Sequence, residues 1–163
     1  MKKLKAGVDK LLEYTVIVLM AISVINVLWQ VFTRFVMRDP SSYTEELARY
    51  LLIWVGLLGA SYAAGKNLHL AIDFFTTRLQ GRARYFSGLF INLVVLLFAV
   101  LVMVVGGIRL VNITLLLNQI SAALQIKLGY VYLAIPLSGA LIAFYALYSL
   151  FDNLRGLTAS SSR

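Results

Sequence analysis

The stretch YFSGLFINLVVLLFAVLVMVVGGI, residues 85–108, contains no charged side chain. A helix needs about 20 predominantly apolar residues to cross the roughly 30 Å hydrocarbon layer of a bilayer, and this stretch exceeds that length. Its central part, residues 93–105, has no polar face, as is typical of a helix that contacts lipid or is buried among other helices. The stretch therefore predicts a transmembrane helix.

Three further stretches without charge occur in the 163 residues, of which 61% are hydrophobic and only 13% charged. None of them alternates apolar and polar residues as barrel strands do, so helices are the expected spanning structures. We predict an all-α integral membrane protein with one domain over residues 1–154 and a disordered tail over residues 155–163. The four spans are expected at about residues 13–35, 46–65, 85–108 and 128–151.

Shorter helices are expected beside the spans. Leu4, Val8, Leu11 and Leu12 recur at helical spacing among lysines, which predicts an amphipathic lead-in that lies on an anionic membrane surface. A short interfacial helix is expected between the second and third spans, within residues 67–84. Residues 110–126 are uncharged apart from their flanks but rich in Asn, Gln, Ser and Thr, so we expect a helix that lies flat or dips back into the membrane.

Basic residues indicate the orientation. The two tails and the middle loop hold ten of the fifteen Lys and Arg residues, whereas the two opposite loops hold five. Because cytoplasmic loops carry the excess of Lys and Arg, both termini are expected in the cytoplasm. The same excess gives a net charge of +8, which in a membrane protein is typical of topology signals and lipid contact and does not indicate nucleic-acid binding.

Few residues offer catalytic or metal-binding chemistry. The chain has no cysteine and one histidine, so we expect no enzyme activity, no metal site and no cofactor. The uncharged stretches hold no ionisable group that could couple proton movement to a solute, although sodium can be bound by backbone carbonyls alone. Asn26, Gln30 and Asn92 are the strongest polar groups there, and they serve either interhelical hydrogen bonds or a solute pathway.

The second span combines an acidic start with a smooth face. Asp39-Pro40 ends the preceding helix, and Ser42 with Glu45 matches a capping box, so the helix begins near Ser42 and enters the membrane near Tyr50. Small residues then follow at helical spacing and let another backbone approach, either within the chain or from another subunit. This small-residue stripe consists of Gly56, Gly59, Ala60, Ala63 and Ala64.

The acidic pair at the start of this helix needs two explanations. Glu45 lies four residues before Arg49, in the favourable orientation for an ion pair on one helix face. Glu46 points about 100° further round the helix. It either lies in a solvated helix start or meets a basic or hydrogen-bonding group of another subunit. His69 and Asp73, also four residues apart, form either a surface pair or a proton relay.

The segment EELARYLLIWVGLLGASYAAGKNLHLAIDFF, residues 45–75, is the specific part of a likeness that extends from about Leu11 to Leu150. It resembles the small membrane subunit of tripartite ATP-independent periplasmic (TRAP) transporters, the DctQ-like family. That family's pattern has an acidic pair, two spaced glycines, a basic residue, and then His and Asp. The matching positions are Glu45, Glu46, Gly56, Gly59, Lys66, His69 and Asp73.

The resemblance implies a scaffold subunit of a sodium-driven uptake system in the bacterial inner membrane. Its implied partners are a large membrane subunit that carries the solute and a periplasmic binding protein that captures it. The implied solute is an organic acid, such as a dicarboxylate, sialic acid or another sugar acid. The alternatives are a small transporter that works alone as an oligomer and a membrane anchor of an enzyme complex, which would need paired histidines or clustered catalytic groups.

Overall fold

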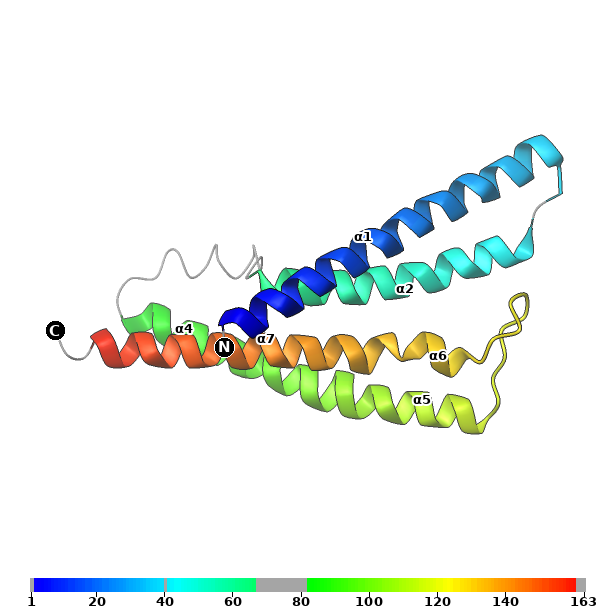
Figure 1. Cartoon of the computed structure of the whole chain (residues 1–163). Helices are drawn as coiled ribbons and strands as arrows, with labels where there is room; N and C mark the ends of the chain where they lie inside the picture. The colour runs from blue at the N-terminus through cyan, green and yellow to red at the C-terminus, as the bar shows by residue number, and fades with distance from the viewer. Residues whose placement is uncertain (1, 40, 67–81, 161–163) are drawn as a thin grey trace.

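The computed structural model describes residues 2–39, 41–66 and 82–160, and all of its regular elements are helices (Figure 1). Two of them are π-helical segments, one at the end of the first long helix and one within the third, in which each hydrogen bond spans one residue more than in an α-helix. In chain order the elements are α1 (Lys2–Phe32), η1 (Thr33–Met37), α2 (Ser42–Gly65), α4 (Arg82–Phe98), η2 (Ala99–Gly106), α5 (Gly107–Leu116), α6 (Leu128–Tyr132) and α7 (Ala134–Ser160).

Within the described part of the chain, four helices are long and apolar enough to cross a membrane. This confirms the predicted all-α fold with four spans. The first and third helices are longer than the sequence indicated, because each continues beyond its uncharged stretch into polar residues. The four helices cover Lys5–Met37, Ser42–Gly65, Ser87–Leu116 and Leu128–Phe151.

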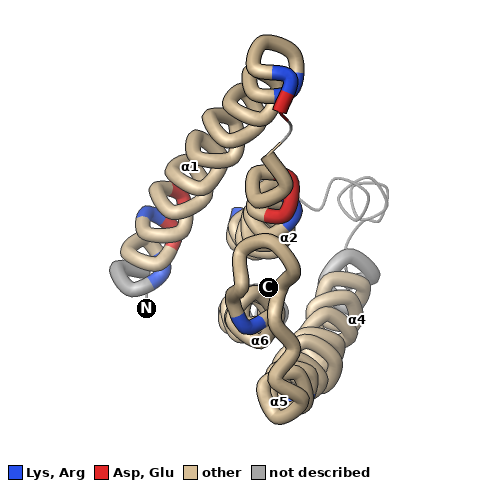
Figure 2. The backbone as a smooth tube through the Cα atoms, turned by 90° about the vertical axis from the view of Figure 1, so that its right-hand side faces the viewer, with Lys and Arg blue, Asp and Glu red and all other residues tan. Residues whose placement is uncertain are grey.

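The helices form a bent row rather than a closed bundle. Seen end-on, α2 lies between α1 and the α6–α7 helix, and the α4–α5 helix packs on the far side of α7 (Figure 2). Along the helix formed by α1 and η1, the charged residues gather at the amino-terminal end and at or just beyond the far end (Figure 2). Along the helix axes, both termini lie toward one end of the molecule, and the start of α2 and the loop 117–127 lie at the other (Figure 1). A row leaves more helix surface exposed than a bundle does, and most of that surface here is apolar.

The core is small and lies where three helices meet. It is built from Leu12 of α1, Leu58 of α2 and Tyr145 of α7, each 5% exposed or less. Larger apolar side chains from the same helices, including Trp54 and Phe144, surround it. The predicted lead-in thus differs from the structure: residues 2–12 are the first turns of α1, and Leu12 faces the other helices. Of its apolar side chains, Leu12 is in the core and Val8 packs against it, whereas Leu11 is exposed.

The polar segment 110–126 also differs from expectation. Its first part continues the third span as α5, and residues 117–127 form a loop with one isolated bridge between Ile120 and Lys127. Within α5, Val111 and Thr114 are buried, and the Thr114 hydroxyl donates to the carbonyl of Leu110. One polar side chain is thereby satisfied inside its own helix, so the segment does not need to lie flat.

Close backbone contact joins α7 to the third helix. A Cβ atom added to Gly139 would lie 2.6 Å from the Met103 Cβ and 3.2 Å from the Ala99 carbonyl oxygen. The wider π-helical turn of η2 brings this backbone against α7, and glycine is the residue that leaves room for it.

Two further predictions concern the carboxyl-terminal tail and the segment between the second and third spans. The last helix continues to Ser160 and therefore includes residues 155–160, for which we expected a disordered tail. Extending an existing helix adds one hydrogen bond for each residue ordered, which is more favourable than starting a new one. The predicted interfacial helix lies largely within residues 67–81, outside the described residues.

Candidate functional site

The start of α2 is built differently from the predicted capping box. Ser41, not Ser42, is the residue that precedes the helix, and its side chain bonds no helical N–H. Instead, Thr44, which is only 1% exposed, donates its hydroxyl to the Ser41 carbonyl at 2.8 Å. The Asn26 amide of α1 donates to the Thr44 carbonyl at 2.8 Å. The helix start is therefore held by a local bond between Thr44 and Ser41 and by one buried contact to α1, in which Asn26 serves an interhelical hydrogen bond.

Glu45 and Arg49 form the predicted ion pair. The Arg49 Nη2 atom lies 3.6 Å from the Glu45 Oε1 atom, and the side chains are 68% and 69% exposed. Exposed pairs of this kind contribute little to stability, because water and salt screen them. Both side chains therefore remain accessible on the surface of α2.

The Glu46 side chain has different partners from that of Glu45. Its Oε1 atom accepts a 2.6 Å hydrogen bond from the Tyr50 hydroxyl. Its Oε2 atom accepts hydrogen bonds from the backbone N–H groups of Ala123 and Leu124, both at 2.8 Å. The hydrogen-bonding group expected from another subunit is thus supplied by the loop 117–127 of the same chain.

The small-residue stripe of α2 divides into an open part and a packed part. A Cβ atom added to Gly56 or Gly59 would meet nothing within 4 Å, and Ala60 is exposed. Ala63 is half-buried and Ala64 is buried. The sequence left open whether this stripe packs within the chain. In the described part of the chain, Gly56 and Gly59 have no close neighbour from another helix, and Ala60 is exposed.

The packed part of α2 faces α7. Ser61 is fully buried, and its hydroxyl lies 3.0 Å from the Leu57 carbonyl oxygen and 3.2 Å from that of Ser138. One turn further on, a Cβ atom added to Gly65 would lie 2.6 Å from the Tyr145 ring. Close packing among the described helices therefore uses Ser61, Ala64 and Gly65, and the open part of the stripe is Gly56, Gly59 and Ala60.

Lys66 is the first residue after α2. Its ammonium group lies 5.4 Å from the centroid of the Tyr62 ring, within the range of a cation–π contact. His69 and Asp73, the other two matching positions of the pattern, lie outside the described residues. In the described part of the chain, no group of three or more His, Asp or Glu side chains could hold a metal ion.

Sequence reasoning missed a polar cluster near the amino terminus. The Tyr145 hydroxyl of α7 donates a 2.6 Å hydrogen bond to Asp9 of α1, and the Tyr62 hydroxyl of α2 lies 3.3 Å from a Glu13 carboxylate oxygen. The sequence feature that could have indicated this cluster is the pair Asp9 and Glu13, two acidic residues four positions apart in an otherwise basic segment. These contacts join α1 to α2 and α7 at the end of the helices where the termini lie.

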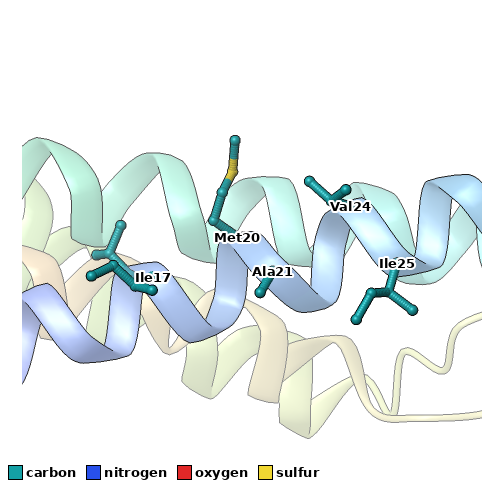
Figure 3. Close-up of a pocket in the computed structure, with 6 residues that line it drawn as sticks. Ile17, Met20, Ala21, Val24 and Ile25 are labelled. Carbon is teal, nitrogen blue, oxygen red and sulfur yellow. The ribbon is translucent and has the colours of Figure 1, made fainter.

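Beyond Glu13, the exposed surface of α1 is almost wholly apolar. An open groove of about 540 Å³ follows it, lined on α1 alone, with Ala21 as the small residue between larger ones (Figure 3). Its lining residues are Val16, Ile17, Met20, Ala21, Val24 and Ile25. A surface of this kind suits lipid chains or another apolar helix.

Comparison with known proteins identifies relatives along the whole chain. The family model described as tripartite ATP-independent periplasmic transporters, DctQ component, matches residues 23–156. The sialic acid TRAP transporter small permease protein SiaQ of Vibrio cholerae is 28% identical over 162 residues, which cover 99% of this chain and 92% of the relative.

Two longer relatives match only through part of their length. The sialic acid TRAP transporter permease protein SiaT of Haemophilus influenzae is 32% identical over 115 residues, which cover 71% of this chain and 18% of the relative. The isethionate TRAP transporter permease protein DctMQ of Oleidesulfovibrio alaskensis is 29% identical over 113 residues, covering 69% and 18%.

Proposed function

The chain belongs to the DctQ component family of tripartite ATP-independent periplasmic transporters and is a small permease subunit of such a transporter, and from this premise we propose its role. It braces the large permease subunit of a sodium-driven uptake system for an organic acid. It also helps to dock the binding protein that delivers the solute. It is a multi-pass protein of the inner membrane with both termini in the cytoplasm.

The observation that carries this proposal is the open part of the small-residue stripe. On this membrane-spanning helix, Gly56 and Gly59 have no close neighbour among the described residues of the other helices, and Ala60 is exposed. In a membrane, helix association depends in large part on close van der Waals packing, which small residues at the interface allow. We assign this surface to a helix of the large subunit, with the exposed Glu45 and Arg49 at its border.

The longer relatives support a pairing of this kind. In the permeases SiaT and DctMQ, the segment similar to this chain makes up 18% of the protein. A single polypeptide keeps its parts at high effective concentration, so an equivalent contact between separate chains needs a dedicated surface. The stripe is the candidate for that surface in this protein.

We assign the docking role to the end of the helices that lies opposite the termini. The start of α2 and the loop 117–127 meet there through Glu46 and present exposed polar residues, among them Glu45, Gln125 and Lys127. The basic asymmetry of the sequence favours the periplasm for this end. The sialic acid relative favours a sugar acid as the solute, with dicarboxylates as the other class to test.

An assembly and uptake experiment tests the role. We expect Ala60→Leu to reduce co-purification with the large subunit, because the leucine would hold the two helices apart. Ala140→Leu is the matched control, since Ala140 is also exposed but belongs to α7. Uptake of labelled sialic acid and of a labelled dicarboxylate is measured in cells that contain the large subunit and the binding protein, with and without sodium.

The outcomes separate the alternatives. Loss of the complex with Ala60→Leu, but not with Ala140→Leu, supports the stripe as the subunit contact. An equal effect of both substitutions contradicts it. Sodium-dependent uptake by liposomes that contain this chain alone would contradict the scaffold role and favour a self-contained transporter.

A further inference from the structure

The contact between Glu46 and the loop 117–127 joins parts of the chain that are far apart in sequence. Ala123 and Leu124 lie 77 and 78 residues from Glu46, and both of their backbone N–H groups donate to the same carboxylate oxygen. The other oxygen accepts the Tyr50 hydroxyl. Both oxygens of one carboxylate are therefore used, and hydrogen bonds to a charged acceptor are stronger than those between neutral groups.

The loop has a defined backbone of its own. Its two sides are joined by hydrogen bonds from Ser121 N to Ile126 O, at 2.9 Å, and from Leu128 N to Gln119 O, at 3.0 Å. Asn118 and Gln125 have positive φ angles of 47° and 54°, which turn the chain at either side of the tip. The tip itself holds Ala123 and Leu124, so Glu46 binds the loop where it turns.

The neighbouring carboxylate behaves differently. Glu45 is 69% exposed and pairs with Arg49 on the surface of α2. The two residues have the same side chain, are adjacent in sequence and lie in the first turns of the same helix. A general effect of negative charge at a helix start would involve both residues. The loop contact therefore arises from the direction in which the Glu46 side chain points.

We propose that Glu46, held by Tyr50, is a positioning residue that fixes the loop 117–127 to the start of α2. We call this contact the loop latch. It sets the shape of the end of the molecule that is opposite the termini, and it acts within this chain, without contact to another subunit. The acceptor oxygens, and not the negative charge alone, are what the loop needs.

The loop latch is tested on the purified full-length chain in detergent or nanodiscs, so the result does not depend on the proposed transport role. Amide hydrogen exchange of residues 117–127 is followed by mass spectrometry. We expect Glu46→Ala to speed exchange at Ala123 and Leu124 by at least about tenfold, because both amides lose their acceptor. Glu45→Ala is the matched control and should leave these two rates unchanged.

A graded series separates acceptor from charge. Glu46→Gln keeps one carbonyl oxygen that can accept from both amides, so its effect should lie between those of wild type and Glu46→Ala. Tyr50→Phe removes the hydroxyl that holds the carboxylate and should also give a smaller effect. Trypsin provides a second measurement, because Lys127 lies in the loop, and cleavage after it requires local opening of the backbone.

The proposal is overturned if Glu46→Ala and Glu45→Ala give the same exchange rates and the same cleavage at Lys127. If Glu46→Ala does not fold, Glu46→Gln and Tyr50→Phe carry the test. Unchanged exchange at Ala123 and Leu124 in both variants then overturns it. Faster exchange in either variant, with Glu45→Gln like wild type, supports it.

Discussion

Tyr145 shows how a single side chain can join three helices. It is 2% exposed, and its hydroxyl bonds Asp9 of α1 while its ring lies against Gly65 of α2. The Lys5 ammonium group lies 6.0 Å from the centroid of the same ring. The ring cannot easily move aside, because it is held at its hydroxyl and packed on its face. Gly65 is therefore required as the residue without a side chain.

Gly65→Ala tests this contact at the scale of the residue. The new methyl group would lie 2.6 Å from the Tyr145 ring, and overpacking of this kind destabilises a protein by about 1–3 kcal/mol. Gly56→Ala is the control on the same helix, since its Cβ would meet nothing within 4 Å. Thermal unfolding in detergent measures both. Equal midpoints for the two variants would contradict the packing of Tyr145 on Gly65.

At the scale of the element, the third helix owes its length and shape to its partners. It combines α4, the π-helical η2 and α5, and it reaches Leu116 although its uncharged stretch ends at Ile108. The η2 segment lies against Gly139 of α7, where two backbones come close. A π-helical turn changes which side chains face the neighbouring helix, so both helices depend on this contact.

Gly139→Leu should separate α7 from η2. The added side chain would meet Met103 and the Ala99 carbonyl oxygen, and we expect a loss of stability of about 1–3 kcal/mol or more. The adjacent Ala140→Leu faces outward and should leave the unfolding midpoint of the isolated chain near that of wild type. A shift of similar size in both variants would contradict the close approach at Gly139.

At the scale of the whole molecule, the bent row explains why so much apolar surface is exposed. The described helices cover little of one another, and only a short stretch of α1 joins the core with α2 and α7. Such a molecule needs lipid or another subunit on both faces of the row. This is consistent with the part of a small permease subunit, whose surroundings complete its packing.

The helix ends near the termini and those at the opposite end of the molecule should lie on opposite sides of the membrane. The chain has no cysteine, so single cysteines can be placed at Ser41, Gln125 and Ser160 without a background signal. We expect an impermeant maleimide to label Ser41→Cys and Gln125→Cys in intact cells and Ser160→Cys only after permeabilisation, because ten of the fifteen basic residues belong to the side of the termini. Labelling of Ser160→Cys from outside would contradict the orientation.

The sequence by itself determined the fold class, the number of spans and the family, because uncharged stretches and the pattern of residues 45–75 are local properties of the chain. It also indicated the Glu45–Arg49 pair, whose partners lie one helical turn apart. It did not reveal the length of the third helix, since the buried Thr114 hydroxyl bonds a carbonyl of its own helix and Leu115 packs against Gly129 of α6. Nor did it show which small residues of α2 are packed, because that depends on where Tyr145 and Ser138 lie.

Only the tertiary structure decided the role of Glu46. Its partners in the loop are backbone N–H groups, which every residue except proline has, so no side-chain pattern marks Ala123 and Leu124 as hydrogen-bond donors. They lie 77 and 78 residues further along the chain, and the fold alone brings them to the start of α2. Local patterns therefore identified the helices, while hydrogen bonds between the Glu46 carboxylate and distant backbone N–H groups hold the start of α2 to the loop 117–127.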